Sequence, residues 1–138
     1  MPKIQTNLKK GSRYNARKRA MMVLYEADLK HASFNEILEQ RKTLPGAQTP
    51  LPAYSVTLIE GIDCHLDEVD QAIAEKMVKR DFVKTNALDK AILRIGAYEL
   101  KFSDVEREVV LQQIQLLTEA YASDTGLDFI FALLSNIQ

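Results

Sequence analysis

One stretch near the middle of the chain, residues 86–100 (NALDKAILRIGAYEL), constrains the fold more than any other. Leu88, Ile92 and Ile95 recur at the three-and-four spacing that places apolar side chains on one face of a helix. Further apolar residues widen this face: Ala87, Ala91, Leu93, Ala97 and Leu100. A helix that is apolar on nearly all sides is buried by other helices. The stretch therefore predicts the central helix of a helical domain.

Two charged residues, Arg94 and Glu99, interrupt the apolar surface of this predicted central helix. Charged side chains are almost never fully buried unless they are paired. We therefore expect both residues to form ion pairs with neighbouring helices rather than to bind a ligand.

The rest of the chain predicts further helices and no convincing strand. Pro45, Pro50 and Pro52 break the pattern, so residues of about 43–52 are predicted to form a loop. In the helix expected near residue 105, Val109 is predicted to face inward. The predicted helices around the central one cover residues of about 13–30, 34–42, 53–64, 66–77, 105–121 and 125–137. Six or seven helices in 138 residues, 46% of them hydrophobic, fit an all-α fold with a single domain over residues 13–138.

The first nineteen residues contain only basic charges, although the formal net charge of the whole chain is −1. Gly11 and Ser12 indicate a break followed by a helix start near Arg13, so residues 1–12 are predicted to form a flexible basic arm. Cations at the amino end of a helix oppose its dipole, which favours a role in binding phosphate. A solubilising tail is the alternative, and charge alone does not decide between them. The basic residues are Lys3, Lys9, Lys10, Arg13, Arg17, Lys18 and Arg19.

Residues that could support catalysis or bind a metal are sparse. Cys64 is the only cysteine, and His31 and His65 are isolated from each other. Phosphate-loop, HExxH and G-x-S-x-G motifs are absent from the sequence. There is neither a secretory signal nor an apolar run long enough for a membrane span. We therefore expect a cytoplasmic binding protein that is not an enzyme and has no cofactor. An acidic run is interpreted as a solvated helix face: Asp63, Asp67, Glu68 and Asp70.

Two motifs resemble the NusB family of bacterial transcription antitermination factors. The first is the arginine-rich start at residues 17–20, which runs into an Ala- and Leu-Tyr-containing helix through Asp28. The second and more specific is LDKAILR at residues 88–94, followed by AYEL at residues 97–100. The Leu66-Asp67 pair and the spacing of the later helices extend the similarity over nearly the whole chain.

The resemblance implies an all-helical fold of two packed halves and a role in transcription of ribosomal RNA. Family members act with ribosomal protein S10 (NusE) on the boxA element of leader transcripts, within the antitermination complex of RNA polymerase. By this resemblance Tyr25 and Asp89 lie at the surface that faces S10. The residues expected to contact RNA are Lys9, Lys10, Arg13, Arg17, Lys18 and Arg19.

The sequence departs from the family pattern in two places. Gln112 and Gln113 stand where the family usually has Asn-Glu, and Phe131 and Ala132 stand where it has Asn-Gly. Phe131 filling space in the core is one interpretation of the second change. The alternative is a NusB-fold interaction module with weakened RNA recognition. The helical domain of a ribosomal RNA methyltransferase would need a catalytic domain after Gln138, and self-association stays open.

Overall fold

The structure, a computed structural model, describes residues 9–43 and 50–138, which contain seven helices and no strand. This confirms the predicted all-α fold. Residues 1–8 of the predicted arm and 44–49 of the predicted loop lie outside the described residues. The helices are α1 (Tyr14–Lys30), α2 (Phe34–Thr43), α3 (Ala53–Cys64), α4 (Leu66–Glu75), α5 (Ala87–Phe102), α6 (Arg107–Tyr121) and α7 (Asp124–Ser135).

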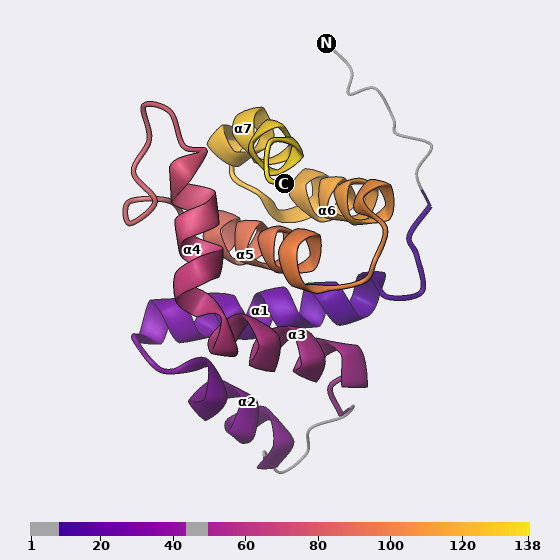
Figure 1. The fold of residues 1–138 in the computed structure, drawn as a ribbon. Helices are drawn as coiled ribbons and strands as arrows, with labels where there is room; N and C mark the ends of the chain where they lie inside the picture. Colours follow the sequence, from indigo (N-terminus) through magenta and orange to yellow (C-terminus); the bar gives the residue numbers. More distant parts are fainter. Residues whose placement is uncertain (1–8, 44–49) are drawn as a thin grey trace.

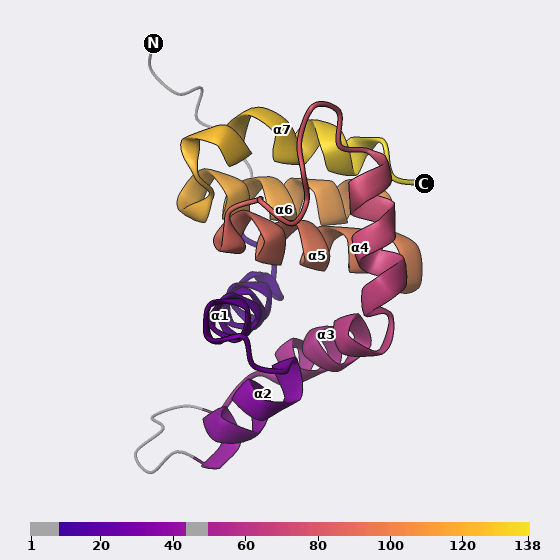
Figure 2. The same ribbon diagram turned by 90° about the vertical axis from the view of Figure 1, so that its left-hand side faces the viewer.

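The helices form two packed halves around α5 (Figures 1 and 2). Helices α1, α2 and α3 pack together on one side of α5, and α6 and α7 pack on the other side. Helix α4 connects the two halves and also packs on α5. The predicted central position of α5 is therefore confirmed. None of the helices in the described ranges is both long and apolar enough to cross a membrane.

Helix α5 is fixed at its start by a side-chain cap and along its length by close packing. The Asn86 side-chain oxygen accepts hydrogen bonds from the backbone N–H groups of Leu88 (2.9 Å) and Asp89 (3.3 Å). Gly96 lets α7 approach closely, because a Cβ there would lie 2.6 Å from a methyl carbon of Leu134. Every residue from Ala91 to Ala97 is buried. Helix α5 thus forms the shared core of both halves.

The two charged residues of α5 form the ion pairs that the sequence predicts. The Arg94 guanidinium donates two hydrogen bonds of 2.9 Å to the carboxylate of Asp70 on α4. Glu99, which is fully buried, pairs with Arg17 on α1. These two pairs connect the middle of the central helix to α4 and its carboxy-terminal part to α1.

Several predicted helix ends and orientations near α6 and α7 are wrong. Helix α6 begins two residues later than residue 105, because the Ser103 hydroxyl accepts from the Val105 N–H and stops the chain from entering the helix there. Val109 is 40% exposed rather than inward, because the buried stripe of α6 runs through Val110, Ile114 and Leu117, and Val109 is turned by about 100° from it. Phe131 is 45% exposed and does not fill the core. Helix α4 ends at Glu75 rather than at residue 77.

Candidate nucleic-acid interface

The cations ahead of α1 and in its first turns lie mostly at the surface. Lys9, Lys10 and Arg13 are exposed, while Lys18 and Arg19 are half-buried. The guanidinium carbon of Arg13 lies 4.1 Å from the centroid of the Tyr54 ring, and the Lys10 ammonium lies 4.8 Å from that of Tyr14. Aromatic faces hold cations in this way while leaving them open to a ligand. The structure therefore orders part of the basic cluster that the sequence indicates.

Arg17 is the exception among the predicted RNA contacts. Its side chain is 2% exposed, and its Nε and Nη2 donate to the two carboxylate oxygens of Glu99 at 2.7 and 2.9 Å. The Tyr54 hydroxyl donates to the same carboxylate, and burial together with this hydrogen bond raises the pKa of Tyr54. A guanidinium enclosed in this way does not reach an RNA phosphate. Arg17 instead supports the surface by fixing Tyr54, the ring beneath Arg13.

Asp89 is also not at the surface, contrary to the expectation for a partner contact. It is 2% exposed, and its carboxylate accepts from the Ser123 backbone N–H (2.9 Å) and hydroxyl (2.5 Å) at the start of α7. Gly126 makes room for this contact, since a Cβ there would lie 2.7 Å from an Asp89 oxygen. A carboxylate at the amino end of a helix stabilises the helix dipole. Asp89 thus joins the starts of α5 and α7.

Tyr25 is half-buried and belongs to an apolar stripe on the outer face of α1. Met22 precedes it by three residues and Leu29 follows by four, so the three side chains lie on one side of the helix. Met22 is 39% exposed and Leu29 is 56% exposed. Exposed apolar side chains grouped on one face are typical of a protein-binding surface.

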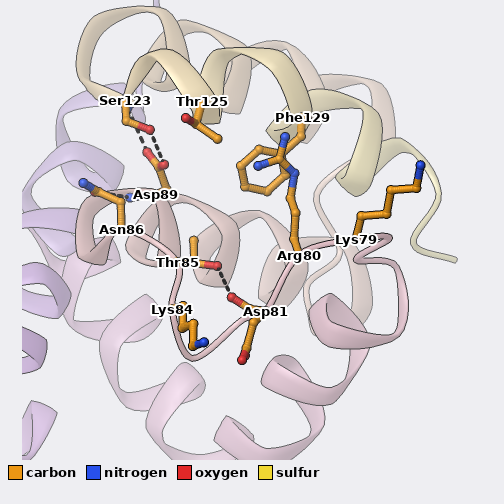
Figure 3. Close-up of a pocket in the computed structure, with 10 residues that line it drawn as sticks. All are labelled: Lys79, Arg80, Asp81, Lys84, Thr85, Asn86, Asp89, Ser123, Thr125 and Phe129. Carbon is orange, nitrogen blue, oxygen red and sulfur yellow. Dashed lines mark hydrogen bonds between the residues drawn. The ribbon is translucent and has the colours of Figure 1, made fainter.

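A second basic surface, not predicted from the sequence, lies between the α4–α5 loop and α7 (Figure 3). We call it the basic basin; it is an open cavity of about 800 Å³. Lys79, Arg80 and Lys84 from the loop supply its cations, and Phe129 from α7 supplies an aromatic wall. The lining is completed by Asp81, Thr85, Asn86, Asp89, Ser123 and Thr125.

The lining of the basic basin contains three cations and two carboxylates, and the three cations are exposed. Of its two carboxylates, Asp89 is engaged by Ser123, and Asp81 accepts a hydrogen bond of 2.9 Å from the Val83 backbone N–H. The Arg80 guanidinium carbon lies 4.4 Å from the centroid of the Phe129 ring. Cations beside an aromatic face are the groups that bind the phosphates and bases of single-stranded nucleic acid. Among the described residues, no group of His, Cys, Asp and Glu is arranged to hold a metal ion.

Comparison with known proteins shows which family the chain belongs to. The family model for "NusB family" matches residues 14–138. Transcription antitermination protein NusB of Bifidobacterium animalis subsp. lactis is 35% identical over 127 residues, which cover 91% of this chain and 82% of that protein. The chain belongs to the NusB family. The NusB of Saccharopolyspora erythraea is 34% identical over 129 residues, covering 92% of this chain and 86% of that one.

Solved NusB structures agree with the fold described above. T. maritima NusB superposes with a TM-score of 0.78 at 21% identity, covering 94% of this chain and 92% of that one. A chain from the crystal structure of antitermination factors NusB and NusE in complex with dsRNA superposes with a TM-score of 0.71 at 26% identity. That match covers 92% of this chain and 97% of the other.

The NusB-family motifs drew attention to α1 and α5, whereas the basic basin depends on a tertiary contact. Lys79 and Arg80 look like an ordinary polar connection in the sequence, and Phe129 looks like one of several core residues of α7. The available signal was a third cation, Lys84, five residues further along the same loop. Only the packing of α7 beside this loop places the four residues around one cavity (Figure 3).

Proposed function

We propose that this NusB-family protein is an RNA-binding transcription antitermination factor that acts with ribosomal protein S10 (NusE) on boxA-type RNA of ribosomal RNA leader transcripts. The observation that carries the proposal is the basic basin, which Lys79, Arg80 and Lys84 line and where Arg80 lies against the Phe129 ring. Family membership and the likeness to a NusB chain crystallised with NusE and RNA support it.

RNA binding in this proposal uses two basic surfaces at opposite ends of α5. The basic basin adjoins Asp89 in the first turn of α5, and the cations ahead of α1 adjoin Glu99 near its end, through Arg17 and Tyr54. Ten residues of helix separate these two positions, or about 15 Å. In this proposal the RNA strand places its phosphates on the cations of both surfaces and a base against Phe129.

The stripe of Met22, Tyr25 and Leu29 is the proposed contact for S10. Met22 and Leu29 are exposed and Tyr25 is half-buried on the outer face of α1, where burial by a partner removes the remaining apolar surface from water. Asp89 contributes indirectly in this proposal, because it fixes α7 against the start of α5. Neither contact needs a catalytic residue, so the protein acts by presenting RNA and partner surfaces and not as an enzyme.

The alternative, a NusB-fold interaction module with weakened or lost specific RNA recognition, is less well supported. It rests on the Asn-to-Phe change at Phe131, but that side chain is exposed on α7 and leaves the core intact. Phe129, two residues earlier, faces the basic basin (Figure 3). The two residues therefore point in different directions, and the departure at Phe131 leaves the basin complete.

Hydrogen exchange of the backbone, measured by mass spectrometry, tests where the ligands bind. Adding boxA-type RNA is expected to slow exchange in residues 79–86, in residues 123–129 and around Arg13. Adding S10 is expected to slow exchange in residues 22–29 of α1. Helix α2, which lies on the opposite side of the molecule from α7, serves as the internal control (Figure 2). If RNA slows hydrogen exchange in neither of the two basic surfaces, the proposed RNA sites are contradicted.

A further inference from the structure

The side chain of Gln113 on α6 connects this helix to the chain that precedes α1. Its Oε1 accepts a hydrogen bond from the Gly11 backbone N–H at 2.9 Å. Its Nε2 donates a hydrogen bond to the Lys9 carbonyl at 3.1 Å. Gln113 is 6% exposed, so its carboxamide is held by the surrounding core. The two hydrogen bonds therefore hold the backbone at the residues on either side of Lys10.

Besides Gln113, this segment is held by a hydrogen bond of 3.1 Å from the Tyr14 N–H to the Gly11 carbonyl and by the ring contacts of Lys10 and Arg13. Gln113 ties the backbone of the segment to α6. Residues 9–13 are all exposed, and segments near a chain end are usually ordered only where something ties them down. Gly11 suits the contact, because a Cβ there would lie only 3.3 Å from Cδ and Oε1 of Gln113. The absence of a side chain lets the backbone lie against the carboxamide.

We propose that Gln113 is a positioning residue for RNA binding: it fastens the basic segment to α6, so that Lys10 and Arg13 meet the RNA backbone from fixed positions. This inference rests on the proposed function. Cations that are ordered before binding lose less conformational freedom when the RNA arrives. Gln113 itself touches only the protein backbone, and its effect on RNA passes through Lys10 and Arg13.

The carboxamide is the group that this contact requires. One end of the side chain must accept from the Gly11 N–H, and the other must donate to the Lys9 carbonyl. A glutamate at residue 113 would keep the first hydrogen bond, but its second oxygen would face a carbonyl oxygen without a proton between them. Methionine has a similar length, adds no charge and makes neither hydrogen bond.

The test compares Gln113→Met with wild type in two measurements on the full chain. In the absence of RNA, the Gly11 backbone amide is expected to exchange its hydrogen with solvent about 3- to 10-fold faster in the variant, as measured by NMR. Affinity for a short boxA-type RNA is expected to fall by about 3- to 10-fold. The dependence of log affinity on log salt should keep its slope, because every cation is still present. Lys10→Ala, in contrast, should reduce that slope by about 0.7.

A second pair of variants separates the lost contact from added charge. Gln113→Glu breaks the contact to Lys9 and adds one negative charge, whereas Gln112→Glu adds the same charge at the neighbouring position. A larger loss of RNA affinity in Gln113→Glu supports the proposal, and equal losses overturn it.

The fastening of the basic segment by Gln113 and its role in RNA binding are tested by different measurements. Unchanged Gly11 exchange in Gln113→Met overturns the fastening, and faster exchange with unchanged RNA affinity overturns its role in RNA binding. Wild-type protein that fails to bind RNA would instead overturn the proposed function and the RNA role together. The exchange measurement contains no RNA, so it still decides whether Gln113 fastens the segment.

Discussion

Replacing Glu99 with alanine is expected to lower the free energy of unfolding by about 3–5 kcal/mol. Glu99 is fully buried, and its carboxylate accepts from Arg17 and from the Tyr54 hydroxyl. Removing it leaves a buried guanidinium without its counter-charge, which is among the most destabilising changes in a protein interior. Urea unfolding followed by circular dichroism measures the loss.

Two further variants show whether the loss comes from the broken buried pair. Glu68→Ala removes a carboxylate that is 64% exposed and pairs with His65, so it should change stability by less than about 1 kcal/mol. Combining Glu99→Leu with Arg17→Met removes both charges and should recover a large part of the stability. A Glu99→Ala protein as stable as Glu68→Ala would contradict the assigned role of this pair.

Removing the three cations of the basic basin is expected to have the largest effect on RNA binding. Each phosphate contact to a single strand contributes about 0.7 to the slope of log affinity against log salt. Replacing Lys79, Arg80 and Lys84 with glutamine should therefore reduce the slope by about 2 and weaken binding on the order of 100-fold near 0.1 M salt. A salt titration of RNA binding, monitored by fluorescence anisotropy, measures both quantities.

The control for the basin variant is Arg41→Gln. Arg41 lies on α2, on the far side of the molecule from α7, and pairs with Glu26. Its loss lowers the net charge without touching the basin, so the slope should stay within about 0.3 of wild type, below half of one phosphate contact. An equal change in slope per charge removed in both variants would show that RNA senses only the net charge, and the basin would lose its assigned role.

Much of the fold could be predicted because its signals are local. The wide apolar face of residues 86–100 indicated a buried central helix, and the two charges within it indicated ion pairs. The start of α6 was harder to place, because a single side-chain hydrogen bond at Ser103 accompanies a start two residues later than expected. The orientation of Val109 was wrong because the buried stripe of α6 runs through its neighbour Val110.

The candidate site could be predicted only in part, because burial of a charged residue depends on its tertiary partner. Arg13 and Arg17 look alike in the sequence, four residues apart in a basic run. The structure places Arg13 at the surface over Tyr54 and encloses Arg17 beside Glu99, which is 82 residues away along the chain. Asp89 is enclosed for the same reason by Ser123. Sequence spacing carries no information on such contacts.

In the proposed function, this NusB-family chain and S10 together recognise boxA-type RNA. The most direct measurement is the affinity for a boxA-type strand and for a scrambled strand of equal composition, with and without purified S10, at about physiological salt. The account predicts that S10 strengthens binding to the boxA-type strand by at least about tenfold more than to the scrambled one. Equal affinity for both strands in the presence of S10 would contradict it.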